Sequence, residues 1–378
     1  MASLYVHIPF CQRKCVYCDF YSIETVALMD GFLDALEREI VLAAPRGGGA
    51  TFGTLFFGGG TPSLLSVAQL GRVMSALRGA FAISRNAEIT LETNPGTVSL
   101  ETLRGYRSLG VNRLSIGIQS FNEDELRFLG RIHDAPQAER CVGLAREAGF
   151  SNVSIDLIYS LPGQTAVQWD ATLARAIGLR PDHVSAYSLI VEDDTPLARM
   201  VSAKLVSPNP LEAEASLYEQ TMGVMARAGL EHYEVSNYAM PGYRSLHNSA
   251  YWSHEPYLGF GPSAHSFWTG RDGEPPLRWS NIPALGRYCD MLRGGEMPVA
   301  SRESVTRTQL CNERIFLGLR SAGVDLSVLE REFGIPADRL ALADALVEEG
   351  VAVLEGTRLC LTPRGYLLCD EIAARMMV

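Results

Sequence analysis

The chain has 378 residues, of which 47% are hydrophobic and 20% charged, enough to bury one large core and a smaller one. Its formal net charge of −10 argues against a nucleic-acid partner, because phosphate binding depends on clustered Lys and Arg. No run approaches the roughly eighteen uncharged apolar residues of a membrane helix, and no signal peptide is expected. Three of the eight cysteines are clustered, as metal ligands would be, which fits a reducing compartment and predicts a cytoplasmic location.

Short runs of β-branched and aromatic residues alternate with longer segments of helical period in the first half of the chain. The expected strands are Leu4–Ile8, Thr54–Phe57, Glu88–Glu92, Arg113–Gly117, Asn152–Leu157 and His183–Ser188. The expected helices between them are Met29–Leu42, Val67–Phe81, Leu100–Leu109, Ala135–Ala148 and Ala166–Leu179. Because strands alternate with helices, the pattern predicts right-handed crossovers and a parallel sheet, which is either open or part of a barrel.

The second half of the chain has a different pattern. A helix is expected over Leu211–Ala228, and a stretch rich in Gly, Pro and aromatic residues runs from Tyr233 to Trp279. After Pro298, three helices, a hairpin and a last helix predict a small winged-helix-like domain. Its elements are Ser304–Leu319, Ser327–Phe333, Ala337–Glu348, the strands Val351–Leu354 and Arg358–Leu361, and a helix after Pro363. We therefore expect three parts, residues 1–230, 231–298 and 299–378.

The C-terminal part carries more acidic than basic residues. Residues 301–378 contain nine Lys and Arg against twelve Asp and Glu. A DNA-binding winged helix needs the opposite balance. This domain is therefore expected to act as a cap or a docking surface.

Three cysteines at x3 and x2 spacing, Cys11, Cys15 and Cys18, follow the first expected strand. The next cysteine is Cys141, so no fourth thiolate lies nearby in the sequence. A closed structural zinc site uses four protein ligands, and His7 could complete one only if its strand curled back. A [4Fe–4S] cluster takes one thiolate per iron, so three cysteines would leave one iron open to a second molecule. The number of ligands favours the cluster.

The cysteine motif, with the aromatic Tyr17 before its last cysteine, resembles that of the radical S-adenosylmethionine (SAM) enzymes. The motifs YVHIPFC, FFGGGTPSLL, ETNPG, SIGIQSF, GRIH and DLIYSLPGQT follow in the order of the oxygen-independent coproporphyrinogen oxidase group, from about Leu4 to about Trp268. The resemblance implies a partial, six-stranded (β/α) barrel with a [4Fe–4S] cluster on the three cysteines. It also implies SAM bound to the open iron through its amino and carboxylate groups.

The motifs lie where ligands bind in parallel α/β folds, at the carboxyl ends of the strands. The candidate SAM-binding residues, placed by the strand ends or by the resemblance, are Tyr5, Tyr17, Gly59, Gly60, Thr61, Glu92, Gln119, Arg131, Asp156 and Ile190. The resemblance implies that the glycine turn contacts the SAM amino group and that Arg131 binds its carboxylate. Glu92 would accept hydrogen bonds from the ribose, and Tyr17 would pack beside the cluster or the adenine.

A second group of residues, HNSAYW, begins at His247. Imidazole binds haem iron axially, and Tyr and Trp offer flat apolar faces to a macrocycle. The pattern HN-x2-YW resembles the motif of the haem-chaperone branch of the same group. The resemblance implies one bound haem with His247 as axial ligand, while Asn248, Tyr251 and Trp252 shape its surroundings.

The chain departs from the oxidase at two places. Asp19–Phe20 stands where the oxidase has Gly-Cys, and ten residues precede Cys11, where the oxidase carries an extension with substrate contacts. A haem chaperone that passes haem to an unidentified acceptor protein is therefore the leading hypothesis. Coproporphyrinogen III oxidase is the alternative, and a zinc-stabilised winged-helix regulator is a third. Any membrane association is expected to be peripheral and through the acceptor, and the oligomeric state is left open.

Overall fold

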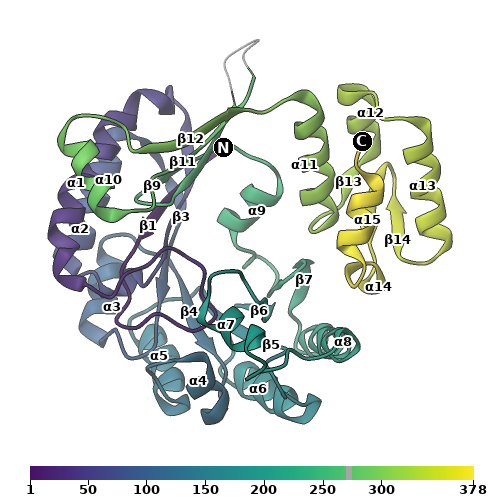
Figure 1. Ribbon diagram of the computed structural model, residues 1–378, viewed down its shortest axis with the longest axis horizontal. Coiled ribbons are helices and arrows are strands. Elements are labelled where there is room, and N and C mark those ends of the chain that lie inside the picture. Colours follow the sequence, from purple (N-terminus) through teal and green to yellow (C-terminus); the bar gives the residue numbers. More distant parts are fainter. Residues whose placement is uncertain (270–274) are drawn as a thin grey trace.

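The protein is an α/β structure built on six parallel strands that form a partial barrel (Figure 1). A computed structural model describes residues 1–269 and 275–378. Neighbouring strands pair in chain order, as β1 (Ala2–Ile8), β2 (Thr51–Gly59), β3 (Ala82–Thr93), β4 (Arg113–Gln119), β5 (Val153–Tyr159) and β6 (His183–Ser188). The six expected strands and the α/β fold class are confirmed, although most of the strands begin or end at other residues.

Helices cover the outer face of these strands (Figure 1). They are α1 (Met29–Ala43), α2 (Val67–Ala80), α3 (Leu100–Ser108), α4 (Glu123–Leu129), α5 (Ala135–Glu147) and α6 (Ala166–Gly178), and α7 (Pro196–Ser202) and α8 (Leu211–Arg227) follow β6. Capping boxes start α2, α3, α5 and α6, where Ser66, Ser99, Asp134 and Thr165 accept a backbone N–H of the first turn. The apolar helix faces meet outward side chains of the strands such as Leu4, which is fully buried.

The barrel stays open between β6 and β1, because each of these strands pairs with an added strand on its free side. The added strands are β7 (Glu231–Glu234), β8 (Asn237–Ala239), β9 (Tyr257–Phe260), β10 (His265–Trp268), β11 (Leu277–Asn281) and β12 (Val299–Ser304). Within the described residues the sheet has twelve strands, so the six expected barrel strands are extended on both sides by strands that the sequence analysis did not predict. Because Ser304 still pairs in β12, the helix expected from that residue begins instead at Arg307, after the N-cap Thr306.

The C-terminal part packs helices around a small sheet, to the right of the barrel in Figure 1. Its elements are α11 (Arg307–Leu319), β13 (Val324–Asp325), α12 (Leu326–Phe333), α13 (Ala337–Glu348), β14 (Ala352–Glu355), β15 (Arg358–Leu361), α14 (Pro363–Tyr366) and α15 (Cys369–Met376). The winged-helix-like arrangement is confirmed, with β13 as a third strand beside the expected hairpin. Glu313 docks this part on the barrel side, through His254 Nε2 at 2.9 Å and through Arg278.

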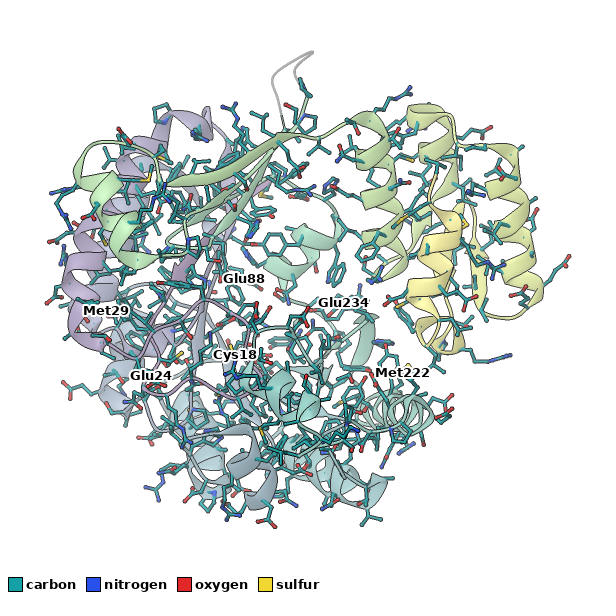
Figure 2. The ribbon with its side chains drawn as sticks, in the orientation of Figure 1. Cys18, Glu24, Met29, Glu88, Met222 and Glu234 are labelled. Atoms are coloured by element: carbon teal, nitrogen blue, oxygen red, sulfur yellow. The ribbon has the colours of Figure 1, made fainter. Side chains whose placement is uncertain are left out.

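Residues 231–298 supply β7 to β11, α9 (Leu246–Trp252) and α10 (Leu285–Arg293). Helix α9 lies between β8 and β9 in the chain and packs against β1 and β2. The carboxylate of Glu88 on β3, which is labelled in Figure 2, accepts the backbone N–H groups of Leu246 and His247 in the first turn of α9. The division of the chain at residues 230 and 298 stays a proposal. Among the described residues, no helix combines the length and apolar composition needed to cross a membrane.

A buried carboxyl group ties the added strands to the first helix. Glu39 on α1 is 1% exposed and accepts hydrogen bonds from the Gly261 N–H at 2.8 Å and the Tyr288 hydroxyl at 2.6 Å. The Asn281 amide donates a third bond. Burial raises the pKa of Glu39 to about 7, although these donors oppose the shift. The native state therefore favours the neutral carboxylic acid at mildly acidic pH.

The titration of Glu39 should make the native state less stable as the pH rises. Its folded pKa of about 7 exceeds the unfolded value of about 4.3, so the native state binds more protons between these values. In the Glu39→Gln variant this group cannot titrate. We expect the stability of the wild type relative to this variant to fall by about 2.5 kcal/mol from pH 5 to pH 8 in urea unfolding.

The control for this measurement is Asp34→Asn, on the exposed face of the same helix, where the side chain is 63% exposed. Its stability difference from the wild type should stay nearly constant over the same range of pH, because exposed charges contribute little. If the difference for Glu39→Gln is equally constant, Glu39 does not titrate as described.

Candidate functional site

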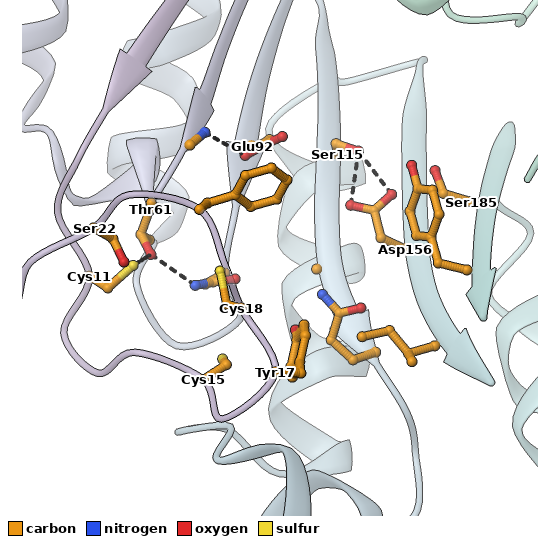
Figure 3. A pocket seen from close by; sticks show the side chains of 18 of the residues that line it. Cys11, Cys15, Tyr17, Cys18, Ser22, Thr61, Glu92, Ser115, Asp156 and Ser185 are labelled. Atoms are coloured by element: carbon orange, nitrogen blue, oxygen red, sulfur yellow. Dashed lines mark hydrogen bonds between the residues drawn. The ribbon is translucent and has the colours of Figure 1, made fainter. Parts of the chain in front are cut away.

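One cavity of about 620 Å³ lies inside the partial barrel and reaches the carboxyl ends of the strands (Figure 3). Its size suits a cofactor-sized molecule. Every residue that the sequence analysis named as a ligand lies in its wall. These residues are Tyr5, Cys11, Cys15, Tyr17, Cys18, Gly59, Gly60, Thr61, Glu92, Gln119, Arg131, Asp156, Ile190 and His247. The binding roles of these residues stay predictions.

The three cysteines lie on the loop that follows β1. The Cys11 N–H donates to Ile23 O at 3.0 Å and so anchors the start of the loop. All three thiols are free and half-buried. Thr61 Oγ1 lies 3.5 Å from Cys11 Sγ, and Arg131 Nη1 lies 3.4 Å from Cys15 Sγ. Two of the three sulfurs therefore already accept a hydrogen bond.

The chemistry of this loop fits an iron–sulfur cluster. Hydrogen bonds to the sulfurs are one means by which proteins tune such clusters. Burial raises the pKa of the Cys18 thiol to about 11, so its thiolate needs a nearby cation, which the iron of a cluster would supply. Within residues 1–269 and 275–378 no three His, Cys, Asp or Glu side chains converge on a point where a single metal ion would fit.

The glycine turn after β2 brings two backbone segments into contact. A Cβ atom on Gly60 would lie 2.7 Å from Phe10 O and 2.8 Å from Ile8 O, so only glycine fits there. The Gly60 N–H donates to Ile8 O at 2.8 Å, and the Thr61 N–H donates to Phe10 O at 2.7 Å. The segment expected to contact SAM therefore also fixes the start of the cysteine loop.

Two half-buried carboxyl groups, Glu92 and Asp156, face the cavity (Figure 3). The Gly59 N–H donates to Glu92 at 3.2 Å, and Ser115 Oγ lies 3.0 Å from both oxygens of Asp156. Burial, followed by the charge of Asp156, raises the pKa of Glu92 to about 8. Burial also raises the pKa of Asp156. A protonated Glu92 can both accept and donate hydrogen bonds, which suits contact with ribose hydroxyls.

Arg131 uses most of its guanidinium on protein partners. Its Nη2 donates to Gly117 O at 2.6 Å and to Asn94 Oδ1 at 2.7 Å. Its buried Nε has no hydrogen-bond partner among the described residues.

Gln119, at the end of β4, has φ of 71°, a left-handed conformation that costs a non-glycine residue about 1–3 kcal/mol and is frequent at binding sites.

The remaining predicted residues of the cavity wall, Tyr17, Ile190 and Tyr5, differ in their surroundings. Tyr17 packs in a small apolar cluster with Leu129 and Ile158. Ile190 is 64% exposed and lies at the mouth of the cavity. Tyr5 Oη lies 3.2 Å from His7 Nδ1, and burial strongly raises the pKa of the Tyr5 hydroxyl, which therefore stays neutral.

His247 on α9 lies in the same wall, towards the amino-terminal ends of the strands. Its Nδ1 is 2.7 Å from Thr54 Oγ1, its ring stacks on Phe56 with centroids 4.9 Å apart, and Tyr251 meets it edge-on. Burial lowers the pKa of His247 to about 3, so the ring is neutral. Its Nε2 has no partner among the described residues. A neutral imidazole with its other nitrogen fixed by a hydrogen bond is the form that binds a metal.

The neighbours of His247 in its motif are placed differently from one another. Asn248 and Tyr251 lie in the cavity wall, whereas Trp252 is not among the described residues that line it. The next histidine, His254, contacts Glu313 of the C-terminal part. It therefore belongs to the docking of the two parts.

The sequence analysis missed part of the wall. Arg113, Ser115, Ser185 and Tyr187 lie at every second position of β4 and β6 and face the cavity. The available signal was their polarity, since strands of a buried parallel sheet are usually apolar on both faces. Arg113 stands out because its side chain is charged and the residue is only 2% exposed.

Comparisons with known proteins agree with this geometry. Residues 5–176 match the radical SAM superfamily, and residues 305–368 match the HemN C-terminal domain. The heme chaperone HemW of Bacillus subtilis (strain 168) is 36% identical over 98% of this chain and 98% of its own. The mitochondrial radical S-adenosyl methionine domain-containing protein 1 of Bos taurus is 39% identical over 100% of this chain and 87% of its own.

The solved structure of coproporphyrinogen III oxidase (HemN) from Escherichia coli, a radical SAM enzyme, has the same overall fold. It matches with a TM-score of 0.84 and 27% identity, over 100% of this chain and 90% of that chain. The relatives match over nearly the full length of the chain, with the cysteine loop, the cavity and the C-terminal domain included. The chain therefore belongs to the radical SAM superfamily and, within it, to the HemW family.

Proposed function

We propose that this protein is a haem chaperone that holds a [4Fe–4S] cluster, SAM and one haem, and passes the haem to an acceptor protein. The observation that carries the proposal is the single cavity that has Cys11, Cys15 and Cys18 in one part of its wall and His247 in another. The name of a relative that is 36% identical over 98% of the chain, heme chaperone HemW, supports it.

In this proposal Cys11, Cys15 and Cys18 ligate three irons of the cluster. When bound, the cluster supplies electrons and one open iron that SAM can chelate. Glu92 and Asp156 hold the polar edge of SAM through their half-buried carboxyl groups. Arg131 lines the cavity, and its guanidinium is the group best suited to the SAM carboxylate.

His247 would bind the haem iron through Nε2, with Thr54 keeping the ring in the required tautomer. The rings of Phe56 and Tyr251 beside it offer apolar contact to the macrocycle. The acceptor is unidentified, and any membrane contact would be peripheral and through it. The free thiols of all eight cysteines support the cytoplasm as the proposed compartment.

Cys15→Ala should prevent stable cluster assembly, because it removes one of only three thiolate ligands. After anaerobic reconstitution we expect iron and sulfide contents at least about tenfold below the wild type and loss of the cluster signal in electron paramagnetic resonance. Cys289→Ala, a half-buried cysteine on α10, is the matched control and should assemble normally. A Cys15→Ala sample with a full cluster would refute the assignment of this ligand.

His247→Ala should weaken haemin binding and change its spectrum, because the axial nitrogen is lost. Thr54→Val, which removes only the hydrogen bond to Nδ1, should weaken haemin binding by about tenfold or more. His247→Ala, which removes the coordinating imidazole itself, should weaken haemin binding at least as much. Titration of each variant with haemin, monitored through the absorbance of the Soret band, measures the affinity and the spectrum. The exposed His265 on β10 provides the control His265→Ala. Equal affinity and an identical spectrum in His247→Ala would show that another group binds the iron.

Coproporphyrinogen oxidation is the second candidate, since the oxidase of Escherichia coli matches the whole chain with a TM-score of 0.84. The cluster loop carries exposed Asp19 and Phe20 where the oxidase has Gly-Cys. Removal of two propionate carboxyl groups needs a pocket that positions two reacting carbons and excludes water.

We expect the reconstituted protein to form no protoporphyrinogen from coproporphyrinogen with SAM and dithionite under anaerobic conditions. The same sample should transfer bound haem to an apo-acceptor protein, and the shift of the Soret band measures this transfer. Steady formation of protoporphyrinogen would favour the enzyme over the chaperone.

A further inference from the structure

Arg113 is a buried cation in the cavity wall that the proposed function does not use. It is the first residue of β4, is 2% exposed and lines the same cavity as His247. Its guanidinium has five N–H donors and no acceptor. Burying such a group costs several kcal/mol unless an anion and hydrogen-bond acceptors surround it. A buried arginine at this position therefore indicates that an anion binds beside it.

The carboxyl groups around Arg113 are directed to other partners. Glu92 accepts the Gly59 N–H, and Asp156 accepts the hydroxyls of Ser115 and Ser154. Arg113 Nε is buried without a hydrogen-bond partner among residues 1–269 and 275–378. No hydrogen bond among the described residues involves the two Nη atoms of Arg113 either, and the residue lines the cavity, so the Nη donors are available to a ligand there.

The strand register places Arg113 near the candidate haem ligand. Arg113 pairs with Thr90 on β3, and Thr90 pairs with Phe56 on β2. Neighbouring strands lie about 4.8 Å apart, so Arg113 and Phe56 are separated by roughly 10 Å. The Phe56 ring stacks on His247 at 4.9 Å. A flat macrocycle bound at His247 Nε2 would therefore bring its edge close to the Arg113 guanidinium.

We propose that Arg113 binds a carboxylate of the ligand held by His247. The inference rests on the proposed function, because haem combines an iron for His247 with carboxylates at the edge of an apolar ring. Arginine suits this role, since its planar fork can hold a carboxylate through two parallel hydrogen bonds. The carboxylate of SAM is the other source of the same chemistry, and the experiment separates the two.

The test compares haemin with its dimethyl ester, in which both carboxylates are blocked. We expect the wild type to bind haemin about 10–100-fold more tightly than the ester, as for hydrogen bonds to a charged group. Arg113→Met should bind the two ligands equally, and Arg113→Lys should keep part of the preference. Arg104→Met, with a 60% exposed side chain, is the control and should keep all of it. SAM affinity, measured by equilibrium dialysis, should be unchanged in Arg113→Met.

A full preference for haemin in Arg113→Met, or no preference in the wild type, would overturn the inference. A loss of SAM affinity with the haemin preference intact would assign Arg113 to SAM and would also overturn it. If the wild type binds neither haemin nor the ester, the proposed function itself fails. Thermal unfolding of each variant is measured alongside. If Arg113→Met does not fold, the preference of Arg113→Lys for haemin over the ester decides, and an undiminished preference would overturn the inference.

Discussion

Side chains alternate between the two faces of the six parallel strands, and this alternation controls the rest of the structure. On β1, Leu4 and Val6 are fully buried in the core that the strands form with the outer helices, whereas Tyr5 lines the cavity. On β4 and β5 the cavity-facing positions include Arg113 and Asp156. The interior of a closed α/β barrel is normally filled with Val, Ile and Leu. Polar side chains at these positions cannot pack in that way, so an interior space remains available to ligands.

The polar interior opposes stability, and the structure compensates for it outside the barrel lumen. Glu92, Asp156 and His247 all have pKa values that burial shifts towards the neutral form, which reduces the charge that the interior must hold. The stabilising core lies between the strands and the outer helices. Glu39 extends that core to the added strands by holding Gly261. Local conflicts of this kind concentrate at functional sites, where the ligand completes the missing interactions.

The sequence predicted the parts of the fold that local patterns determine. The six parallel strands contain short runs of β-branched and aromatic residues, and the cysteine loop and glycine turn directly follow two of them. The added strands escaped prediction because they are short and depend on distant partners. In β9, Tyr257 pairs with Ser3 at the other end of the chain. In β12, the run Val299–Ser304 is largely exposed and polar, so it carries no buried-strand signal.

The candidate site was predictable to the extent that motifs marked it. Cys11, Glu92 and His247 belong to recognisable patterns, and the structure places all three in one wall. Arg113 begins an apolar strand and reads as a surface residue in the sequence. Only the pairing of β4 with β3 and the closure of the cavity above it show that its side chain faces the interior.

The open seam between β6 and β1 gives this barrel a second end at which side chains can meet a ligand. On β2, Thr54 contacts His247, and Gly59 lies five residues further along, beside the turn that holds the cysteine loop. At about 3.3 Å per residue these positions are roughly 16 Å apart. Closed barrels bind ligands only at the carboxyl ends of their strands. Here α9 packs on β1 and β2 from the open side, so His247 reaches the lumen from the amino-terminal direction, and the proposed cluster and haem sites need not compete for one position.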